Sequence, residues 1–123
     1  MRPFSGLSVL LLEDEYLIAL DAEDILTSLG VKQIQVVNTL AGAAEAAENG
    51  GVDLAILDLN INGELSLDVA RQFREHGTPI VFASGYELRD RISAEIEQGD
   101  VYLRKPYTSE SLQEAVHTAL DNR

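Results

Sequence analysis

The sequence predicts a doubly wound α/β fold, in which a five-stranded parallel sheet is covered by helices on both faces. Short, apolar, β-prone runs alternate with longer segments whose apolar residues have helical spacing, and glycines stand where those helical segments should end. Strands that alternate with helices are joined by right-handed crossovers, so neighbouring strands run parallel. A fold of this class carries its site at the carboxyl ends of its strands.

The expected strands are the five apolar runs at residues 7–12, 33–37, 54–58, 79–83 and 101–104. The first, third and fourth are almost entirely apolar, which is typical of central strands in a parallel sheet. The second, QIQVV, is the most polar of the five, and we expect it at an edge of the sheet.

Five helices are expected between and after these strands. The second, which is alanine-rich, should begin after a cap at Asn38 or Thr39, and the fifth after a cap at Thr108 or Ser109. The first four should stop at glycines, namely Gly30, Gly50, Gly77 and Gly99. Four of these helices have a clear apolar stripe. The stripe of the first consists of Ile18, Ala22, Ile25, Leu26 and Leu29, and that of the third of Leu65, Val69, Ala70 and Phe73. The stripe of the fourth consists of Leu88, Ile92 and Ile96, and that of the fifth of Leu112, Ala115, Val116, Ala119 and Leu120.

Length and composition describe one globular domain. The 123 residues suffice for a single core, so we expect residues 1–123 to form one domain without an output domain. No apolar run approaches the roughly 20 residues that cross a bilayer. The first residues, MRPFSGLSVLLLEDE, lack a secretory layout, so we expect a cytoplasmic protein with no membrane partner. Without cysteine, the chain has neither disulfides nor thiolate metal sites.

The charge is strongly acidic, with a net value of −12. Nucleic-acid phosphates are bound mainly by basic patches, so direct binding of nucleic acid by this chain is not expected. Two explanations of the excess acid remain open. Either the carboxylates serve only solubility, or some of them bind a divalent cation. The positions of the acidic residues in the fold distinguish the two explanations.

Polar side chains follow four of the expected strands. They are Glu13, Asp14 and Glu15 after the first, Asp58 at the end of the third, Ser84 and Gly85 at the end of the fourth, and Lys105 and Pro106 after the fifth. Taken singly, acids after a strand suit the start of a helix, a Ser-Gly pair suits a turn, and a Lys-Pro pair ends a strand. Together, they should meet at one edge of the sheet.

That meeting of charges predicts a particular chemistry. Carboxylates a few ångströms apart repel by several kcal/mol per pair at an effective dielectric near 20, so they need a cation or another neutralising partner. An all-oxygen site suits Mg²⁺. A carboxylate surrounded by a metal ion, a lysine and a hydroxyl has the groups needed to attack phosphorus and to accept a phosphoryl group.

Four motifs, in this order, resemble those of the receiver domains of two-component response regulators: LLLEDE, ILDLN, FASGY and LRKPY. The resemblance covers the chain from end to end and implies a flavodoxin-like, CheY-like sheet with the strand order 2-1-3-4-5. PIVFASGY also resembles the Pro-Phe-x-Phe-Ala-Thr-Gly-Tyr signature of the alphaproteobacterial FAT GUY receivers, with Ile80 and Ser84 as substitutions, and DLNINGELS fits the same subgroup.

The resemblance implies a phosphoacceptor and a metal site. Asp58 would become the aspartyl phosphate. Asp14 and Asp58 would bind Mg²⁺, or Mn²⁺, directly, together with the backbone carbonyl of Asn60. Glu13 would act on the cation through a water molecule.

The resemblance also implies the groups that sense the phosphoryl group. Ser84 would donate a hydrogen bond to one phosphoryl oxygen, and Lys105 would pair with another. Tyr102 matches the aromatic residue that turns inward when that hydroxyl moves, and Tyr86 is a second candidate for this role unless it simply caps the fourth helix. The peptide bond between Lys105 and Pro106 would be cis.

Two departures from the family pattern stand out. The loop DLNINGELS lacks the proline that most receivers carry after the phosphoacceptor, which leaves the start of the third helix and its partner surface open. Ser84 replaces the usual threonine, which keeps the hydroxyl but removes a methyl group and some rotamer restraint.

The leading functional hypothesis is a signalling switch. A sensor histidine kinase, of the HWE or a related class, or a histidine phosphotransfer protein would donate a phosphoryl group to Asp58. The signal would leave through a protein partner, or the domain would act as a phosphate sink. On this hypothesis the chain is a monomer or weak dimer, and it is no enzyme beyond catalysing its own phosphorylation and dephosphorylation.

Two alternatives remain. A haloacid-dehalogenase-like phosphatase also combines an aspartate nucleophile, Mg²⁺, a hydroxyl and a lysine on an α/β sheet, but it needs Asp-x-Asp after the first strand, where this chain has Glu13-Asp14-Glu15-Tyr16, and usually a cap domain. The second alternative is an interaction module that is not phosphorylated. The complete set of acid, hydroxyl and lysine argues against it.

Overall fold

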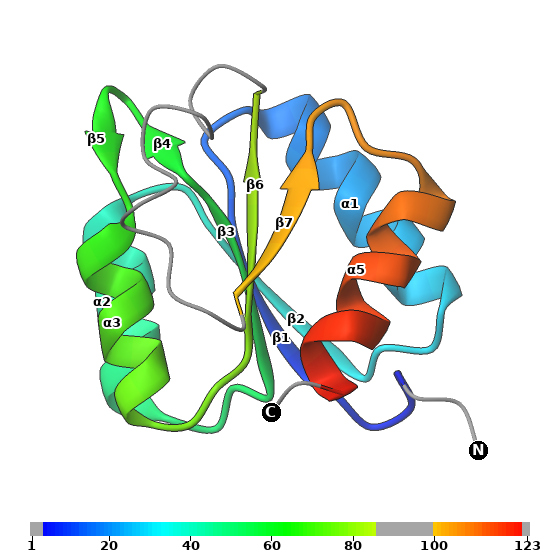
Figure 1. Ribbon diagram of the computed structural model, residues 1–123, viewed down its shortest axis with the longest axis horizontal. Helices are drawn as coiled ribbons and strands as arrows, with labels where there is room; N and C mark the ends of the chain where they lie inside the picture. Colours follow the sequence, from blue (N-terminus) through cyan, green and yellow to red (C-terminus); the bar gives the residue numbers. More distant parts are fainter. Residues whose placement is uncertain (1–3, 86–99, 122–123) are drawn as a thin grey trace.

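A five-stranded parallel sheet forms the centre of the domain (Figure 1). The structure is a computed structural model that describes residues 4–85 and 100–121. The strands lie in the order β2 (Gln33–Val37), β1 (Ser8–Leu12), β3 (Leu54–Asp58), β6 (Ile80–Ser84) and β7 (Val101–Arg104). This is the predicted order 2-1-3-4-5, with β6 and β7 as the fourth and fifth strands of the sheet, and the polar strand β2 lies at the edge as expected.

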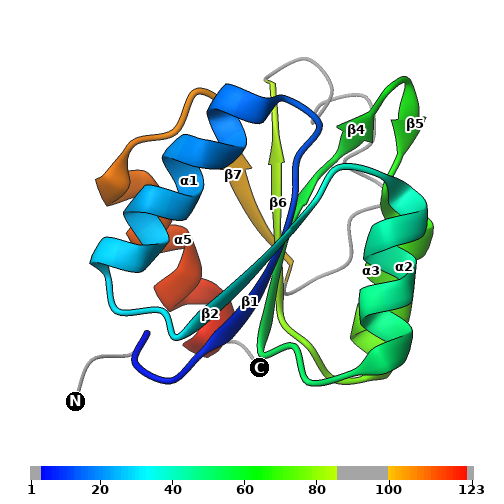
Figure 2. The same cartoon turned by 180° about the vertical axis from the view of Figure 1, so that it is seen from behind.

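Helices cover both faces of the sheet. Figures 1 and 2 show α1 (Tyr16–Ser28) and α5 (Ser109–Asp121) on one face, and α2 (Leu40–Asn49) and α3 (Leu67–Glu75) on the other. The predicted fourth helix, with Leu88, Ile92 and Ile96, lies outside the described residues, as does Tyr86. None of the helices in residues 4–85 and 100–121 combines the length and apolar character that crossing a membrane requires.

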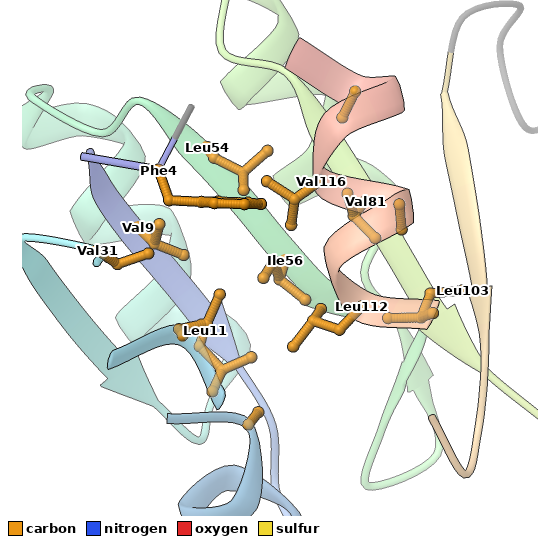
Figure 3. Close-up of a cluster of buried hydrophobic side chains, with 14 of the residues drawn as sticks. Phe4, Val9, Leu11, Val31, Leu54, Ile56, Val81, Leu103, Leu112 and Val116 are labelled. Carbon is orange, nitrogen blue, oxygen red and sulfur yellow. The ribbon is translucent and has the colours of Figure 1, made fainter. Parts of the chain in front are cut away.

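The core consists of two layers, because successive strand residues point to opposite faces. Val9 and Leu11 point toward α1 and α5, into the cluster shown in Figure 3, whereas Leu10 and Leu12 point toward α2 and α3. All five residues of β3 and of β6 are buried, as the apolar sequences of these central strands predict. The N-terminal Phe4, 2% exposed, completes the first layer.

Most helix ends lie where the sequence predicts them. The Thr39 side chain caps α2 by accepting a hydrogen bond from the Gly42 amide. Thr108, directly before α5, accepts one from the Ser111 amide. Gly30, after α1, has a φ of 97°, in the left-handed region that a glycine adopts at no steric cost.

The segment between β3 and α3 differs from the prediction. Leu65 was expected on the apolar stripe of the third helix, but it lies in a two-stranded hairpin, β4 (Asn60–Ile61) and β5 (Glu64–Leu65), and is 38% exposed. The hairpin turns at Asn62 and Gly63, whose φ values of 52° and 89° suit a two-residue turn that requires positive φ at both positions. Helix α3 therefore starts later than expected. The hairpin stands at the edge of the sheet where β3 and β6 end (Figure 1).

Candidate functional site

The predicted site residues do meet at the carboxyl edge of the sheet. The residue after β1, after β3 and after β7 still donates its amide to the neighbouring strand. Thus Glu13 N–H bonds the Val37 carbonyl at 3.0 Å, and Lys105 N–H bonds the Ser84 carbonyl at 2.9 Å. These bonds extend the hydrogen-bond pattern of the sheet one residue beyond the ends of the strands. They fix the backbone from which Glu13 and Lys105 reach toward Asp58.

Lys105 bridges two carboxylates. Its ammonium Nζ lies 2.7 Å from Glu13 Oε1 and 2.9 Å from Asp58 Oδ2. The three side chains are largely shielded from water, with exposed fractions of 17% for Lys105, 2% for Glu13 and 8% for Asp58. Electrostatic attraction is weakly screened at such a position, so one lysine holds both acids.

Asp14 adds a third carboxylate to this cluster. One carboxylate oxygen from each of Glu13, Asp14 and Asp58 lies within 4.8 Å of the others. Three carboxylates and one ammonium leave two negative charges when all are ionised. Hard divalent cations prefer oxygen ligands of this kind, so the donor set fits Mg²⁺ or Mn²⁺.

Burial governs the protonation of the two bridged acids. Loss of water raises the pKa of Glu13 to about 6, although its bonds to Lys105 and to the Glu15 amide act the other way. Burial likewise raises the pKa of Asp58, again against the effect of Lys105. For Lys105, burial alone would lower the pKa, but its bonds to Glu13 and Asp58 outweigh this and raise it. In the metal-free protein, the lysine compensates the cost of burying the acids only in part.

This imbalance predicts how stability depends on pH without metal. The pKa of Glu13 is about 6 in the folded protein and 4.5 for an ordinary glutamate. Between these values the folded state binds more protons than the unfolded state. The contribution of Glu13 to stability therefore falls as pH rises through this range, and it becomes constant only about one pH unit above the folded pKa. We expect the melting temperature of the wild type to fall relative to Glu13→Gln through this window when both are measured without divalent cations. A difference that stays constant, or that increases with pH, would contradict the prediction.

Asn60 follows the cluster at the start of the hairpin. Its amide donates to Asp58 Oδ1 at 3.4 Å, and its side-chain Oδ1 accepts from the Gly63 amide at 2.8 Å. The Asn62 amide in turn donates to Asp14 Oδ2 at 3.2 Å. The hairpin is thus tied to two of the carboxylates. The role of the Asn60 carbonyl as a metal ligand stays a prediction.

Ser84 and Tyr102 bond to one acceptor. The Ser84 hydroxyl donates to the Gly85 carbonyl at 3.2 Å, and the Tyr102 hydroxyl donates to the same oxygen at 3.0 Å. Ser84 is buried at the end of β6, and Tyr102 lies on the neighbouring strand β7. The two residues named as sensing groups therefore lie together. The peptide bond between Lys105 and Pro106 is cis, as the family resemblance implied.

Ser66 is a residue of this site that the sequence did not reveal. It is fully buried, and its hydroxyl donates to the backbone carbonyl of Asp58 at 2.8 Å. A serine before an amphipathic segment is usually a helix cap, so its sequence context indicates another role. Tyr107 is a second unforeseen neighbour, with a pKa raised to about 12 by burial and then by the charge of Glu13.

The five-stranded parallel sheet and the charged residues at its carboxyl edge define a flavodoxin-like domain. Residues 9–117 match the family model described as the response regulator receiver domain. The chain belongs to that family. Its members are generally signalling switches and not enzymes in the ordinary sense, which favours the switch over the phosphatase alternative.

Solved structures agree with this assignment. The crystal structure of a response regulator receiver protein from Sinorhizobium medicae WSM419 has a TM-score of 0.85 and 30% identity, covering 94% of this chain and 95% of that chain. The solution structure of SdrG from Sphingomonas melonis Fr1 has a TM-score of 0.77 and 34% identity, covering 94% and 97%. The receiver domain of the TMAO respiratory system response regulator TorR has a TM-score of 0.80 and 27% identity, covering 94% and 97%. A search of curated protein sequences gives no significant match. The FAT GUY subgroup stays a prediction.

Proposed function

We propose that this domain is a phosphoacceptor switch, which takes a phosphoryl group onto Asp58 from a phosphohistidine of a sensor kinase or phosphotransfer protein. The observation that carries the proposal is the position of Asp58. Its carboxylate ends a central strand, bonds Lys105 at 2.9 Å and lies within 4.8 Å of the carboxylates of Glu13 and Asp14. A buried carboxylate with a raised pKa is also typical of functional sites.

The side chains around Asp58 suit an in-line transfer. A carboxylate oxygen of Asp58 attacks phosphorus, the bond between phosphorus and the donor imidazole nitrogen breaks, and the electron pair of that bond leaves on the imidazole. Lys105 stays close enough to neutralise charge on the incoming group, and Ser84, at the end of the next strand, is the candidate donor to a phosphoryl oxygen. The product is an acyl phosphate on Asp58.

The residues present fit a bound Mg²⁺ or Mn²⁺. Asp14, Asp58 and the carbonyl of Asn60 would hold the cation, with Glu13 acting through water. When bound, it supplies positive charge that stabilises the phosphoryl oxygens during transfer. While the cation is absent, the bond from Lys105 to Glu13 offsets part of the negative charge of the cluster.

Mg²⁺ is expected to raise the melting temperature near neutral pH, because it relieves the repulsion among the three carboxylates. At a free concentration about 100 times its Kd, the gain in the free energy of unfolding is about 2.7 kcal/mol. The measurement is a thermal melt over a series of MgCl₂ concentrations, with NaCl at equal ionic strength as control, since general screening also affects a chain of net charge −12. An equal response to both salts would count against a cation site.

The surface beside the site favours a protein as phosphoryl donor. Helix α1 begins next to the acidic cluster and leaves Tyr16 74% and Leu17 77% exposed. Leu17 also lines a pocket with Lys105, Pro106 and Tyr107. Exposed apolar side chains of this size suit contact with a helix that carries a phosphohistidine, and they have no evident use for a small phosphomonoester. The resemblance to the FAT GUY subgroup favours a donor kinase of the HWE or a related class.

The signal can leave the receiver domain in two ways. We infer a cytoplasmic domain that is a monomer or weak dimer. It passes the signal to a protein partner through surface contacts, or it drains phosphoryl groups from a shared donor as a phosphate sink. The reaction at Asp58 is its own phosphorylation and dephosphorylation, with no other substrate.

Incubation with acetyl phosphate and Mg²⁺, followed by intact-mass measurement, tests the proposal. We expect a gain of one phosphoryl group, which is lost on treatment with hydroxylamine because an acyl phosphate is labile to it. Asp24→Asn, which removes an exposed carboxylate from α1, should behave like the wild type. No gain in mass with acetyl phosphate or a phosphorylated kinase would leave the interaction module, and turnover of phosphomonoesters would indicate a phosphatase.

A further inference from the structure

The hydroxyl of Ser66 has an unusual partner for its position. Ser66 directly precedes α3, where a serine side chain commonly accepts a hydrogen bond from one of the first helical amides. Within the part of the chain that the structure describes, its side chain makes no such cap bond. It donates instead to the backbone carbonyl of Asp58, eight residues earlier, at 2.8 Å, and the residue is fully buried. The helix thus forgoes a side-chain cap in favour of a bond to the phosphoacceptor.

The end of the β1–β3 ladder explains why Asp58 needs this bond. The Leu59 amide donates to Ala83 on β6, and the two ends of one trans peptide point in opposite directions, so the Asp58 carbonyl points away from β6 toward the β1 side. The β1–β3 register ends at Leu12 and Leu57, one residue before Asp58. A buried carbonyl left there without a donor would be costly, and Ser66 supplies the donor.

A second bond ties the same hairpin to the other side of the cluster. The Asn62 amide donates to Asp14 Oδ2 at 3.2 Å across 48 residues of sequence. This amide can point there because Asn62 and Gly63 both adopt positive φ in the turn. In the sequence, Asn60, whose carbonyl is a predicted ligand of the cation, lies between Asp58, to which Ser66 donates, and Asn62.

We propose that the hairpin of residues 60–65, together with Ser66 directly after it, positions the cation site, and that Ser66 is the positioning residue. By bonding the carbonyl of Asp58, Ser66 fixes the peptide that follows the phosphoacceptor and so the place of Asn60. The inference rests on the proposed function, because it concerns the same cation and the same phosphoryl transfer. Groups that orient metal ligands without touching the metal commonly change affinity or activity by about 10- to 100-fold when removed.

The test compares two buried hydroxyls at opposite ends of the sheet. Ser66→Ala removes the bond to Asp58. Thr78→Val removes a longer, part-buried bond of 3.4 Å from the hydroxyl of Thr78, 9% exposed, to the Val52 carbonyl, which lies before the amino end of β3. Both variants should lose stability, as removal of a buried hydrogen bond predicts. Only Ser66→Ala should weaken Mg²⁺ binding, by about tenfold, as measured from melting temperatures over a Mg²⁺ titration. Its phosphorylation by acetyl phosphate at low Mg²⁺ should slow accordingly and recover in part when Mg²⁺ is raised.

Three outcomes overturn the inference in different ways. If Ser66→Ala keeps wild-type Mg²⁺ affinity and phosphorylation rate, the hydroxyl is only structural. If Ser66→Ala does not fold, Gly63→Ala takes its place. Gly63 is exposed, and a Cβ there would meet open space. The alanine would therefore strain only the turn, because the φ of 89° at this position is unfavourable for any residue but glycine. Unchanged Mg²⁺ affinity in that variant overturns the inference, and weaker affinity supports it. A wild type that shows no specific Mg²⁺ response overturns the proposed cation site as well, which separates the two failures.

Discussion

Asp58→Asn is expected to abolish phosphorylation and, in the same molecule, to raise the melting temperature without metal. The amide cannot form an acyl phosphate by attack of a carboxylate oxygen, so the gain in mass with acetyl phosphate should disappear. The stability effect follows from the raised pKa of Asp58, since burial makes its charged form unfavourable in the folded state. We expect a gain of about 1 kcal/mol, the size of a partly compensated charge repulsion. That corresponds to a rise of about 4 °C for a domain of this size.

The control for this result is the loss of one negative charge elsewhere. Asp24→Asn changes the net charge by the same amount at an exposed position of α1, so it measures the general effect of charge on a chain of net charge −12. The Asp58 variant should exceed it in melting temperature and should respond less to Mg²⁺. A lower melting temperature than that of the wild type would mean that the bond from Lys105 to Asp58 outweighs burial.

Lys105→Ala is expected to have the opposite effect on stability. It leaves Glu13 and Asp58 buried without the ammonium that bonds both. Removal of one partner from a buried ion pair costs about 3 kcal/mol or more. The loss should be largest at neutral pH, because in acid the two carboxylates take up protons and no longer need the lysine. Mg²⁺ should restore more stability to this variant than to the wild type, because the cation supplies the missing positive charge.

Lys32→Ala provides a close control, since Lys32 and Lys105 are the only lysines of the chain and Lys32 is exposed. Its unfolding in urea, followed by circular dichroism, should match that of the wild type within about 0.5 kcal/mol. The prediction is wrong if the Lys105 variant is as stable as the Lys32 variant at pH 7. In that case the site would be open to water, and its charges would be screened.

Local patterns were sufficient to predict the sheet and most helix ends. The apolar runs ending at Leu12 and Asp58 and the turn glycines are local signals, and the parallel connections make the strand ends converge. The hairpin after β3 also had a local signal, because Asn62-Gly63 between short β-prone stretches is a strong indicator of a two-residue turn. The apolar spacing from Leu65 to Phe73 also fits a helix, and for this reason the predicted start of α3 is wrong.

The site could be predicted only as far as the backbone fixes it. The sequence indicates that Glu13, Asp58 and Lys105 share an edge, but not that one ammonium lies between the first two, because this depends on side-chain geometry across three strands. The role of Ser66 could not be predicted either. The Asp58 carbonyl is available to the Ser66 hydroxyl because the β1–β3 ladder ends at Leu57, one residue before Asp58. The roles of Asp14 and Asn60 toward a cation stay predictions.

The Gly85 carbonyl, which accepts from both Ser84 and Tyr102, bears on the order in which the two residues respond. A carbonyl oxygen has two lone pairs, so the two donors do not compete for it. If Ser84 turns toward a phosphoryl oxygen, the hydrogen bond from Tyr102 to the Gly85 carbonyl is neither strengthened nor weakened directly. These two bonds therefore permit stepwise rotation of the residues. Coupling through the space that Ser84 vacates would be steric, and it would act separately from these two bonds.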